Sequence, residues 1–286
     1  LRGNEVEENT TRQMLKAPRE SYTKSLWAVR SFQRKQKSLA KAEATPVISV
    51  QNVTAAYGKN EPVVRNVSFD IHAGRTVAVV GESGSGKSTA ARCITGLLPP
   101  LSGSISFNGT PLPPDYRNRS NDQLRQIQMI YQMADTALNP RRKIGEIIGR
   151  PVEFYRGLTG QAKRRRVEEL LAQIELEPSE FIDRYPSEVS GGQKQRIGIA
   201  RALAAEPKFV ICDEVTSALD QLVAEGILRL LTDLQDKMHL SFMLITHDLS
   251  TVRAIADEVV VMKDGAVVEA GPKDDMFTPP HHAYTD

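Results

Sequence analysis

The fold of this 286-residue chain is decided by residues 75–98, RTVAVVGESGSGKSTAARCITGLL. This stretch begins with a short apolar run that is typical of a buried strand, continues with a glycine-rich turn, and ends in a predicted helix. Glycines let the backbone approach an anion and adopt positive φ, so that successive N–H groups and the helix N-terminus face the anion. The stretch therefore predicts a phosphate-binding turn between a strand and a helix.

The turn contains Gly81-x4-Gly86-Lys87-Ser88, which matches the P-loop pattern in its required place, after a strand and before a helix. In this pattern the lysine bridges the β- and γ-phosphates of a nucleotide, and the hydroxyl group is a ligand of Mg²⁺. We therefore expect a nucleoside triphosphate and Mg²⁺ here. The predicted nucleotide-binding residues of the turn are Gly81, Ser83, Gly84, Ser85, Gly86, Lys87, Ser88 and Thr89.

A second element, FVICDE at 209–214, supplies the carboxylates that such a site needs. Four apolar residues predict a buried strand that ends at Asp213, and open α/β sheets bind ligands at the carboxyl ends of their strands. We expect Asp213 to hold Mg²⁺ and Glu214 to polarise the attacking water as a general base. Adjacent acids after a strand are often only a solvated strand end, but the apolar run and the P-loop favour a functional role.

A third motif, VSGGQKQRIGIARALAAEP at 189–207, contains a second glycine pair that the first phosphate site does not need. Ser190, Gly191, Gly192 and Gln193 open a predicted helix and so form another anion-binding N-terminus. This motif resembles the LSGGQ signature of the ATP-binding cassette (ABC) family, with Val189 in place of the leucine. The resemblance implies that the motif caps the γ-phosphate of ATP held by the P-loop of an opposite protomer.

Further motifs follow in the order found in the ABC family, over residues 47–286. Tyr57 in VTAAYG resembles the aromatic residue that stacks on adenine, and Gln132 in MIYQ resembles the Q-loop glutamine, which senses Mg²⁺ and the attacking water. Asp220 in SALD resembles the D-loop aspartate at the protomer interface. His247 in LITHD resembles the switch histidine that contacts the γ-phosphate. The resemblance therefore implies an ATPase, with Glu214, His247 and Gln132 as catalytic residues and Ser88, Gln132 and Asp213 at the metal.

The expected fold is α/β: a P-loop NTPase (RecA-like) core with an antiparallel β subdomain and an inserted α-helical subdomain at about 134–190. Strands are predicted at 47–53, 67–71 and 103–107 for the antiparallel sheet, and at 76–80, 127–131, 209–213, 241–246 and 258–262 for the parallel core.

Two segments, YQMADTALNPRR at 131–142 and the terminal PPHHAYT, are similar to sequences of the peptide, nickel and glutathione importers of the family. The resemblance implies a subunit at the cytoplasmic face of the inner membrane that energises import of oligopeptides or peptide-like solutes by ATP-driven dimer closure. The implied partners are a second nucleotide-binding domain, transmembrane permease subunits and, indirectly, a solute-binding protein. Soluble cassette ATPases of DNA repair or translation, and scaffolds such as those of carbon–phosphorus lyase assemblies, are the alternatives.

The beginning of the chain resembles its own end at an offset of 262 residues, with seven identities in 23 positions, among them Tyr22 with Tyr284 and Thr23 with Thr285. We therefore expect residues 1–23 to be the closing element of a preceding nucleotide-binding domain, 24–46 a basic linker, and 47–286 the second cassette of a fused tandem ATPase. A native N-terminal extension is the alternative.

Composition limits the partners. No apolar run approaches the ~20 residues needed to cross a bilayer, so we expect a soluble intracellular chain. A formal charge of +2 does not argue for nucleic acid. The basic KRRR at 163–166 is predicted to form a helix face with ion pairs such as Arg164 to Glu168. Cys93 and Cys212, far apart in apolar settings, are predicted to be buried thiols.

Overall fold

The computed structural model describes residues 45–279 except 59 and 60, residues 282–285, and the single residues 8, 10, 13, 19 and 20. The expected closing element at 1–23 and the expected linker at 24–46 lie outside the described residues, apart from those single positions and residues 45 and 46.

Strands and helices alternate along most of the described chain. The strands are β1 (Ile48–Ala55), β2 (Val64–Ile71), β3 (Thr76–Val80), β4 (Ser102–Phe107), β5 (Thr110–Pro111), β6 (Ile127–Ile130), β7 (Phe209–Asp213), β8 (Ser241–Ile245), β9 (Glu258–Lys263) and β10 (Ala266–Pro272). The helices are α3 (Lys87–Thr95), α4 (Asn121–Gln126), α5 (Ala134–Ala137), α6 (Ile144–Arg156), α7 (Gly160–Gln173), α8 (Pro178–Phe181), α9 (Gly191–Leu203), α10 (Gln221–Met238) and α11 (Leu249–Ile255), with 3-10 turns η1 (Tyr116–Asn118), η2 (Pro186–Glu188) and η3 (Asp275–Phe277).

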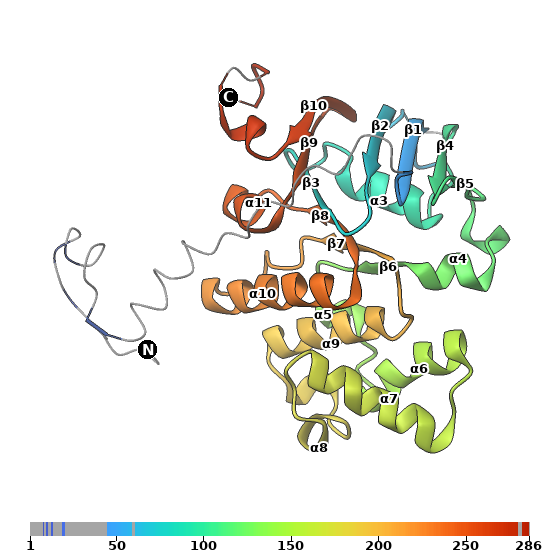
Figure 1. Cartoon of the computed structure of the whole chain (residues 1–286), viewed down its shortest axis with the longest axis vertical. Coiled ribbons are helices and arrows are strands. Elements are labelled where there is room, and N and C mark those ends of the chain that lie inside the picture. The colour runs from blue at the N-terminus through green and yellow to red at the C-terminus, as the bar shows by residue number, and fades with distance from the viewer. Residues whose placement is uncertain are drawn as a thin grey trace.

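The strands form two sheets, both visible in Figure 1. The smaller sheet has the order β2-β1-β4-β5 and is antiparallel. The larger sheet has the order β10-β9-β3-β8-β7-β6. Its strands β9, β3, β8, β7 and β6 are mutually parallel, and β10 is antiparallel at the edge. The strands expected from the sequence are confirmed to within a few residues, whereas β5 and β10 were not among them.

The two faces of the large sheet pack against different layers, because side chains alternate along each strand. On β7, Phe209 and Ile211 belong to the core between the two sheets, which also contains Ala91 and Ile94 of α3. The intervening Val210 and Cys212 belong to the core on the other face, with α9 and α10. The P-loop helix α3 and helix α9 therefore lie on opposite faces of the large sheet, as Figure 1 shows.

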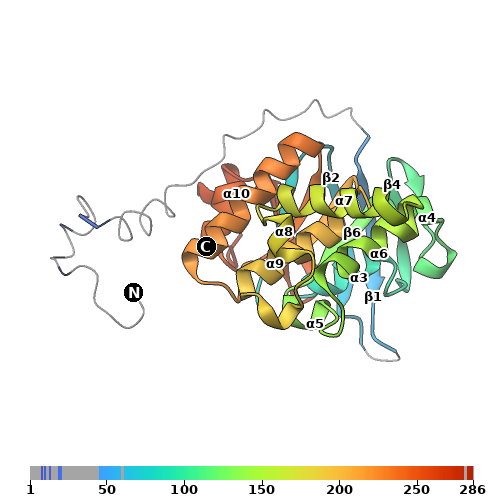
Figure 2. The ribbon, with the colours of Figure 1, turned by 90° about the horizontal axis from the view of Figure 1, so that it is seen from below.

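Helices α6 and α7 contribute side chains to the same core as α9 and α10. In α6, Ile144, Ile148 and Val152 recur at a spacing of four residues and form one buried stripe, against which Val167 and Leu171 of α7 pack. Seen from below, α6, α7, α8 and α9 cover this side of the molecule (Figure 2). The sheet topology and these layers confirm the expected α/β fold with an antiparallel sheet and a helical part.

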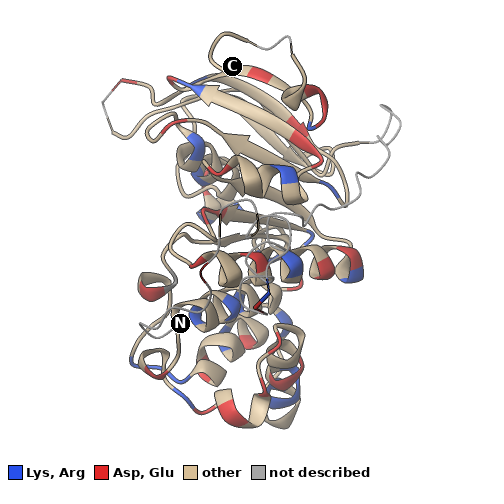
Figure 3. Ribbon diagram, turned by 90° about the vertical axis from the view of Figure 1, so that its left-hand side faces the viewer, with Lys and Arg blue, Asp and Glu red and all other residues tan. Residues whose placement is uncertain are grey.

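Charged residues of both signs are interspersed along the helices (Figure 3). The expected pair on α7 is present, with Arg164 Nε 3.0 Å from Glu168 Oε1. Cys93 and Cys212 are free and buried, as predicted. None of the helices that the structure describes combines the length and the apolar character needed to cross a bilayer.

Candidate functional site

The P-loop follows β3 and is closed against the turn after β9. The backbone φ angles of Gly81, Gly84 and Gly86 are 146°, 86° and 99°. Residues other than glycine rarely adopt φ values in this region. A Cβ on Gly81 would lie 2.1 Å from the carbonyl oxygen of Met262, so only glycine fits there. Gly86 is the N-cap of α3 and makes no side-chain cap, which leaves the helix N-terminus open toward an anion. In the same loop, Ser83 and Gly84 are exposed and Ser85 is buried.

Lys87 is buried, and its amine turns back into the curve of the loop. Nζ donates to the carbonyl oxygens of Gly81 and Glu82, both at 2.7 Å, and to Ser85 Oγ at 3.3 Å. Burial lowers the pKa of Lys87, and the negative charges of Glu214 and Asp213 oppose that shift. These acids therefore help to keep a cation inside the loop, where phosphate oxygens can replace its weaker contacts.

Ser88, at the start of α3, meets the end of β7. Its Oγ donates to Asp213 Oδ1 at 3.1 Å. Burial raises the pKa of Asp213, while the hydrogen bond from Ser88 lowers it and the neighbouring Glu214 raises it. A hydroxyl and a carboxylate oxygen side by side are the hard ligands that Mg²⁺ prefers, and Mg²⁺ commonly takes only one or two protein ligands beside phosphates and water. The pair therefore fits the magnesium ion that the P-loop implies.

Glu214 is held between two side chains from neighbouring strand ends. Gln132 Nε2 donates to Glu214 Oε2 at 2.5 Å, and His247 Nδ1 lies 3.5 Å from Glu214 Oε1. Gln132 follows β6, Glu214 follows β7 and His247 comes two residues after β8, and these three strands are adjacent and parallel. Their carboxyl ends therefore bring residues 82 and 33 positions apart in the sequence to one point beside Ser88 and Asp213.

Tyr57 lies beside the first two turns of α3. Its hydroxyl is 3.3 Å from Thr89 Oγ1 and accepts a hydrogen bond of 3.2 Å from Arg92 Nη1. The guanidinium of Arg92 also lies over the Tyr57 ring, 5.8 Å from its centre. Sequence reasoning missed Arg92, although it lies one helical turn beyond Ser88. It also missed Ser217, which accepts a hydrogen bond of 3.4 Å from Gln132 Nε2 and belongs to the quoted SALD motif.

The signature residues form the beginning of α9. Ser190 and Gln193 cap the helix reciprocally: the N–H of Ser190 donates to Gln193 Oε1 at 2.9 Å, and the N–H of Gln193 donates to Ser190 Oγ at 3.4 Å. Gly192 packs so closely on α10 that a Cβ would lie 2.4 Å from a methyl group of Val223. Ser190 and Gly191 are exposed. Asp220 caps α10 by accepting from the N–H of Val223 at 3.0 Å.

The structure therefore brings most predicted residues into one place and leaves one group apart. Lys87, Ser88, Asp213, Glu214, Gln132 and His247 are linked by hydrogen bonds, ion pairs or electrostatic contacts, and Tyr57 joins them through Thr89 on α3. Among the described residues, no hydrogen bond or ion pair joins 190–193 to the P-loop. The signature turn and the P-loop of one chain do not share a phosphate site in this structure.

A strand, a glycine-rich loop with an inward lysine, and a helix beside a strand-end carboxylate define a P-loop nucleotide-binding domain. The family model for the ABC transporter matches residues 64–217 of the chain. The chain belongs to the ABC transporter family.

Relatives and solved structures agree with this assignment. The chain is 44% identical over 230 residues to the "Probable peptide ABC transporter ATP-binding protein y4tS" of Sinorhizobium fredii, covering 79% of this chain and 65% of that protein. It is 45% identical over 254 residues to the "Peptidoglycan transport ATP-binding protein YejF" of Agrobacterium fabrum, covering 84% of this chain and 46% of that protein. The chain thus matches just under two thirds of the length of the first relative and about half of the second.

Among solved structures, one similar to this chain is described as "Dimeric structure of a post-hydrolysis state of the ATP-binding cassette MJ0796 bound to ADP and Pi". The TM-score is 0.69 at 31% sequence identity, and the match covers 79% of this chain and 98% of that one.

Proposed function

We propose that this chain is the ATP-hydrolysing subunit of an ABC importer for oligopeptides or peptide-like solutes. The observation that carries the proposal is the Glu214 carboxylate, held between Gln132 and His247 next to the Ser88–Asp213 pair. A carboxylate placed by a positioning amide and an imidazole, beside hard metal ligands and a P-loop, is suited to activating water for attack on a phosphoryl group.

The proposed roles follow from this placement. Tyr57 stacks on the adenine and Lys87 contacts the β- and γ-phosphates. Ser88, Asp213 and Gln132 would hold Mg²⁺, which when bound neutralises phosphate charge. Glu214 accepts the proton of the water whose oxygen attacks the γ-phosphorus, while the bond to the ADP oxygen breaks. His247 contacts the γ-phosphate and orients Glu214.

We propose that a second nucleotide-binding domain, fused or in a homodimer, completes each site. The support is that α9 and α3 lie on opposite faces of one sheet, so the exposed Ser190 turn is presented away from its own P-loop. ATP held by Lys87 of one copy and by Ser190, Gly192 and Gln193 of another has a higher affinity for the closed dimer, which is what a ligand needs in order to drive a conformational change.

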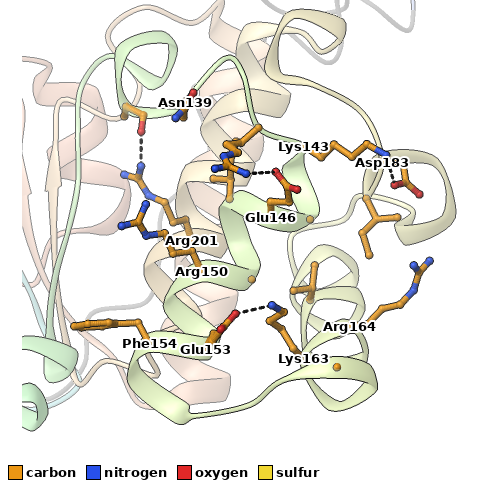
Figure 4. Close-up of a pocket in the computed structure, with 18 residues that line it drawn as sticks. Asn139, Lys143, Glu146, Arg150, Glu153, Phe154, Lys163, Arg164, Asp183 and Arg201 are labelled. Atoms are coloured by element: carbon orange, nitrogen blue, oxygen red, sulfur yellow. Dashed lines mark hydrogen bonds and ion pairs between the residues drawn. The ribbon is translucent and has the colours of Figure 1, made fainter.

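The permease partner is proposed to bind the groove in Figure 4, which has a volume of about 1100 Å³. The groove lies among α6, α7 and the segment that follows Gln132. A partner bound there would therefore contact the same stretch of chain that carries Gln132, which is hydrogen-bonded to Glu214. Phe154 on its rim is 62% exposed, and no described ion pair involves Arg150 in its wall. The chain would bind peripherally to the cytoplasmic face of the membrane through this groove, with a solute-binding protein as an indirect partner.

We also propose that residues 47–286 are the second cassette of a tandem ATPase, with 1–23 and 24–46 as the closing element and linker. The repeat at an offset of 262 residues supports this, as does the match to only 46% of YejF. The coding sequence before Leu1 tests it, since a tandem protein has another P-loop there.

The function itself is tested by neighbouring genes and by turnover. An importer subunit predicts genes for two permeases and a solute-binding protein beside this one, and Mg²⁺-dependent ATP hydrolysis by the purified chain. A purified wild-type chain that neither binds nor hydrolyses ATP would contradict the proposal.

A further inference from the structure

We propose that Tyr284, in the C-terminal segment, is a positioning residue for Lys87 that acts through the peptide between Gly81 and Glu82. The inference rests on the proposed function, in which the P-loop binds ATP. Tyr284 belongs to the terminal PPHHAYT sequence, which resembles the importers of the family.

The peptide unit between Gly81 and Glu82 makes a hydrogen bond through its N–H and another through its carbonyl group. The N–H of Glu82 donates to the Tyr284 hydroxyl at 3.2 Å. The carbonyl oxygen of the same peptide, on Gly81, accepts from Lys87 Nζ at 2.7 Å. A peptide unit is planar, so its N–H and C=O cannot rotate independently. Consecutive hydrogen bonds also polarise one another. The tyrosine hydroxyl therefore fixes the orientation of the carbonyl group that holds the lysine amine.

Tyr284 is itself held in place. Its ring packs against the apolar cluster that includes Val80, the last residue of β3 before the loop. Lys263 Nζ lies 4.5 Å from the ring centre. The N–H of Tyr284 donates to His282 Nδ1 at 3.2 Å, and the N–H of His282 donates to Glu269 Oε2 at 3.1 Å. A short turn tied to β10 thus presents the hydroxyl to the loop.

Strand β9 and the turn after it also contact the P-loop. The carbonyl of Met262 faces Gly81, and the N–H of Gly265 donates to the carbonyl oxygen of Ser85 at 3.2 Å. Together with Tyr284, these elements contact the loop at Gly81, Glu82 and Ser85. The loop N–H groups that face inward remain available to phosphate oxygens. Strand β9, the turn after it and the C-terminal segment therefore form a wall behind the P-loop.

The change that isolates the hydroxyl is Tyr284→Phe, which keeps the packed ring. Without the hydroxyl, the N–H of Glu82 loses its acceptor, the Gly81–Glu82 peptide is no longer fixed, and Lys87 is less well oriented before ATP arrives. The net free energy that one such hydrogen bond contributes changes an equilibrium constant by about two- to tenfold. We therefore expect the Kd and KM for ATP to rise about two- to tenfold, with kcat changed less than about twofold.

The matched control is Phe277→Leu. Phe277 packs against the same apolar cluster and lies under the guanidinium of Arg253, and none of the described hydrogen bonds joins it to the P-loop. The experiment measures the Kd for ATP in EDTA, which prevents hydrolysis, together with steady-state kcat and KM and the Tm of each apoprotein. A structural role alone would lower Tm in both variants and leave KM unchanged in both.

We expect Tyr284→Phe to weaken ATP binding with little change in Tm, whereas Phe277→Leu should lower Tm and keep the wild-type Kd. Equal ATP affinity in wild type and Tyr284→Phe would overturn the inference and leave the proposed function standing. An equal loss of affinity in Phe277→Leu would also overturn it. A wild-type protein that binds no ATP would instead overturn the proposed function, and this inference with it.

Discussion

The hydroxyl of Ser88 lies 3.1 Å from the Asp213 carboxylate, so one hydrogen bond joins the first turn of the P-loop helix to the end of β7, which lies two strands away from β3 in the sheet. This contact spans 125 residues of sequence and places the metal ligands beside Glu214.

Replacing Glu214 by Gln should reduce ATP hydrolysis by about 10²–10⁴-fold, because the amide cannot accept the proton of the attacking water. ATP binding should persist, since Lys87 and Ser88 are untouched, and the ATP-loaded variant should accumulate as a dimer. Steady-state turnover and size-exclusion chromatography with ATP check this. Undiminished turnover would rule out Glu214 as the base.

Replacing Lys87 by Ala should raise the Kd for ATP by about 10- to 100-fold, the range expected for the loss of a charged hydrogen-bond donor to phosphate. Isothermal titration measures it. The control is Lys237→Ala, which removes an exposed lysine near the end of α10 and should bind ATP like the wild type. Unchanged affinity in Lys87→Ala would refute the phosphate site.

The isolated chain should hydrolyse ATP with a specific activity that rises with protein concentration, because each site needs the signature turn of another copy. Turnover measured over a wide concentration range, with Ser190→Ala at the same concentrations, checks this. A specific activity that does not vary with concentration would mean that one cassette is sufficient.

Asp213 should cost the apoprotein stability at neutral pH. Burial raises the pKa of its carboxyl group, and a group whose pKa is higher in the folded state contributes stability at low pH that is lost as the pH rises through the folded-state pKa. Asp213→Asn should therefore raise the Tm of the apoprotein at pH 7 while it removes Mg²⁺-dependent hydrolysis. Thermal unfolding without nucleotide and a turnover assay measure the two effects, and a lower Tm would contradict the first.

Asp248 should have the opposite pH dependence. Burial alone would raise its pKa, but hydrogen bonds from Thr251 and Ser250 outweigh this effect and lower it. Its stabilisation is therefore present above the ordinary carboxyl pKa and is lost as the pH falls through the lowered value. Asp248→Asn should cost a few tenths to about 1 kcal/mol at pH 7, a figure reduced by solvent screening because the residue is exposed. Urea unfolding at pH 7 and at pH 3 should show the difference shrinking with acid.

Much of this site is predictable because its residues follow local rules. The P-loop glycines, Lys87 and Ser88 lie within eight residues of one another, and their pattern requires the positive φ values that the structure has. The meeting of Glu214 and His247 follows from a general rule, since the ends of parallel strands gather at one edge of a sheet.

Other contacts depend on packing that no local pattern encodes. Tyr284 reaches Glu82 only because the C-terminal turn returns to β3, across 202 positions of sequence. Arg92 meets Tyr57 because β1 lies beside α3. Strand β10 is half-buried along most of its length, which gives a weaker apolar pattern than the fully buried β3 and explains why it was missed.

In the proposed mechanism, ATP is held between two copies of this domain. A structure of the Glu214→Gln variant bound to ATP and Mg²⁺ would show this arrangement. We expect Ser190 Oγ of one copy within hydrogen-bond distance of the γ-phosphate that Lys87 of the other copy holds. A well-ordered ATP complex in which Ser190 of every copy is distant from every γ-phosphate would contradict it.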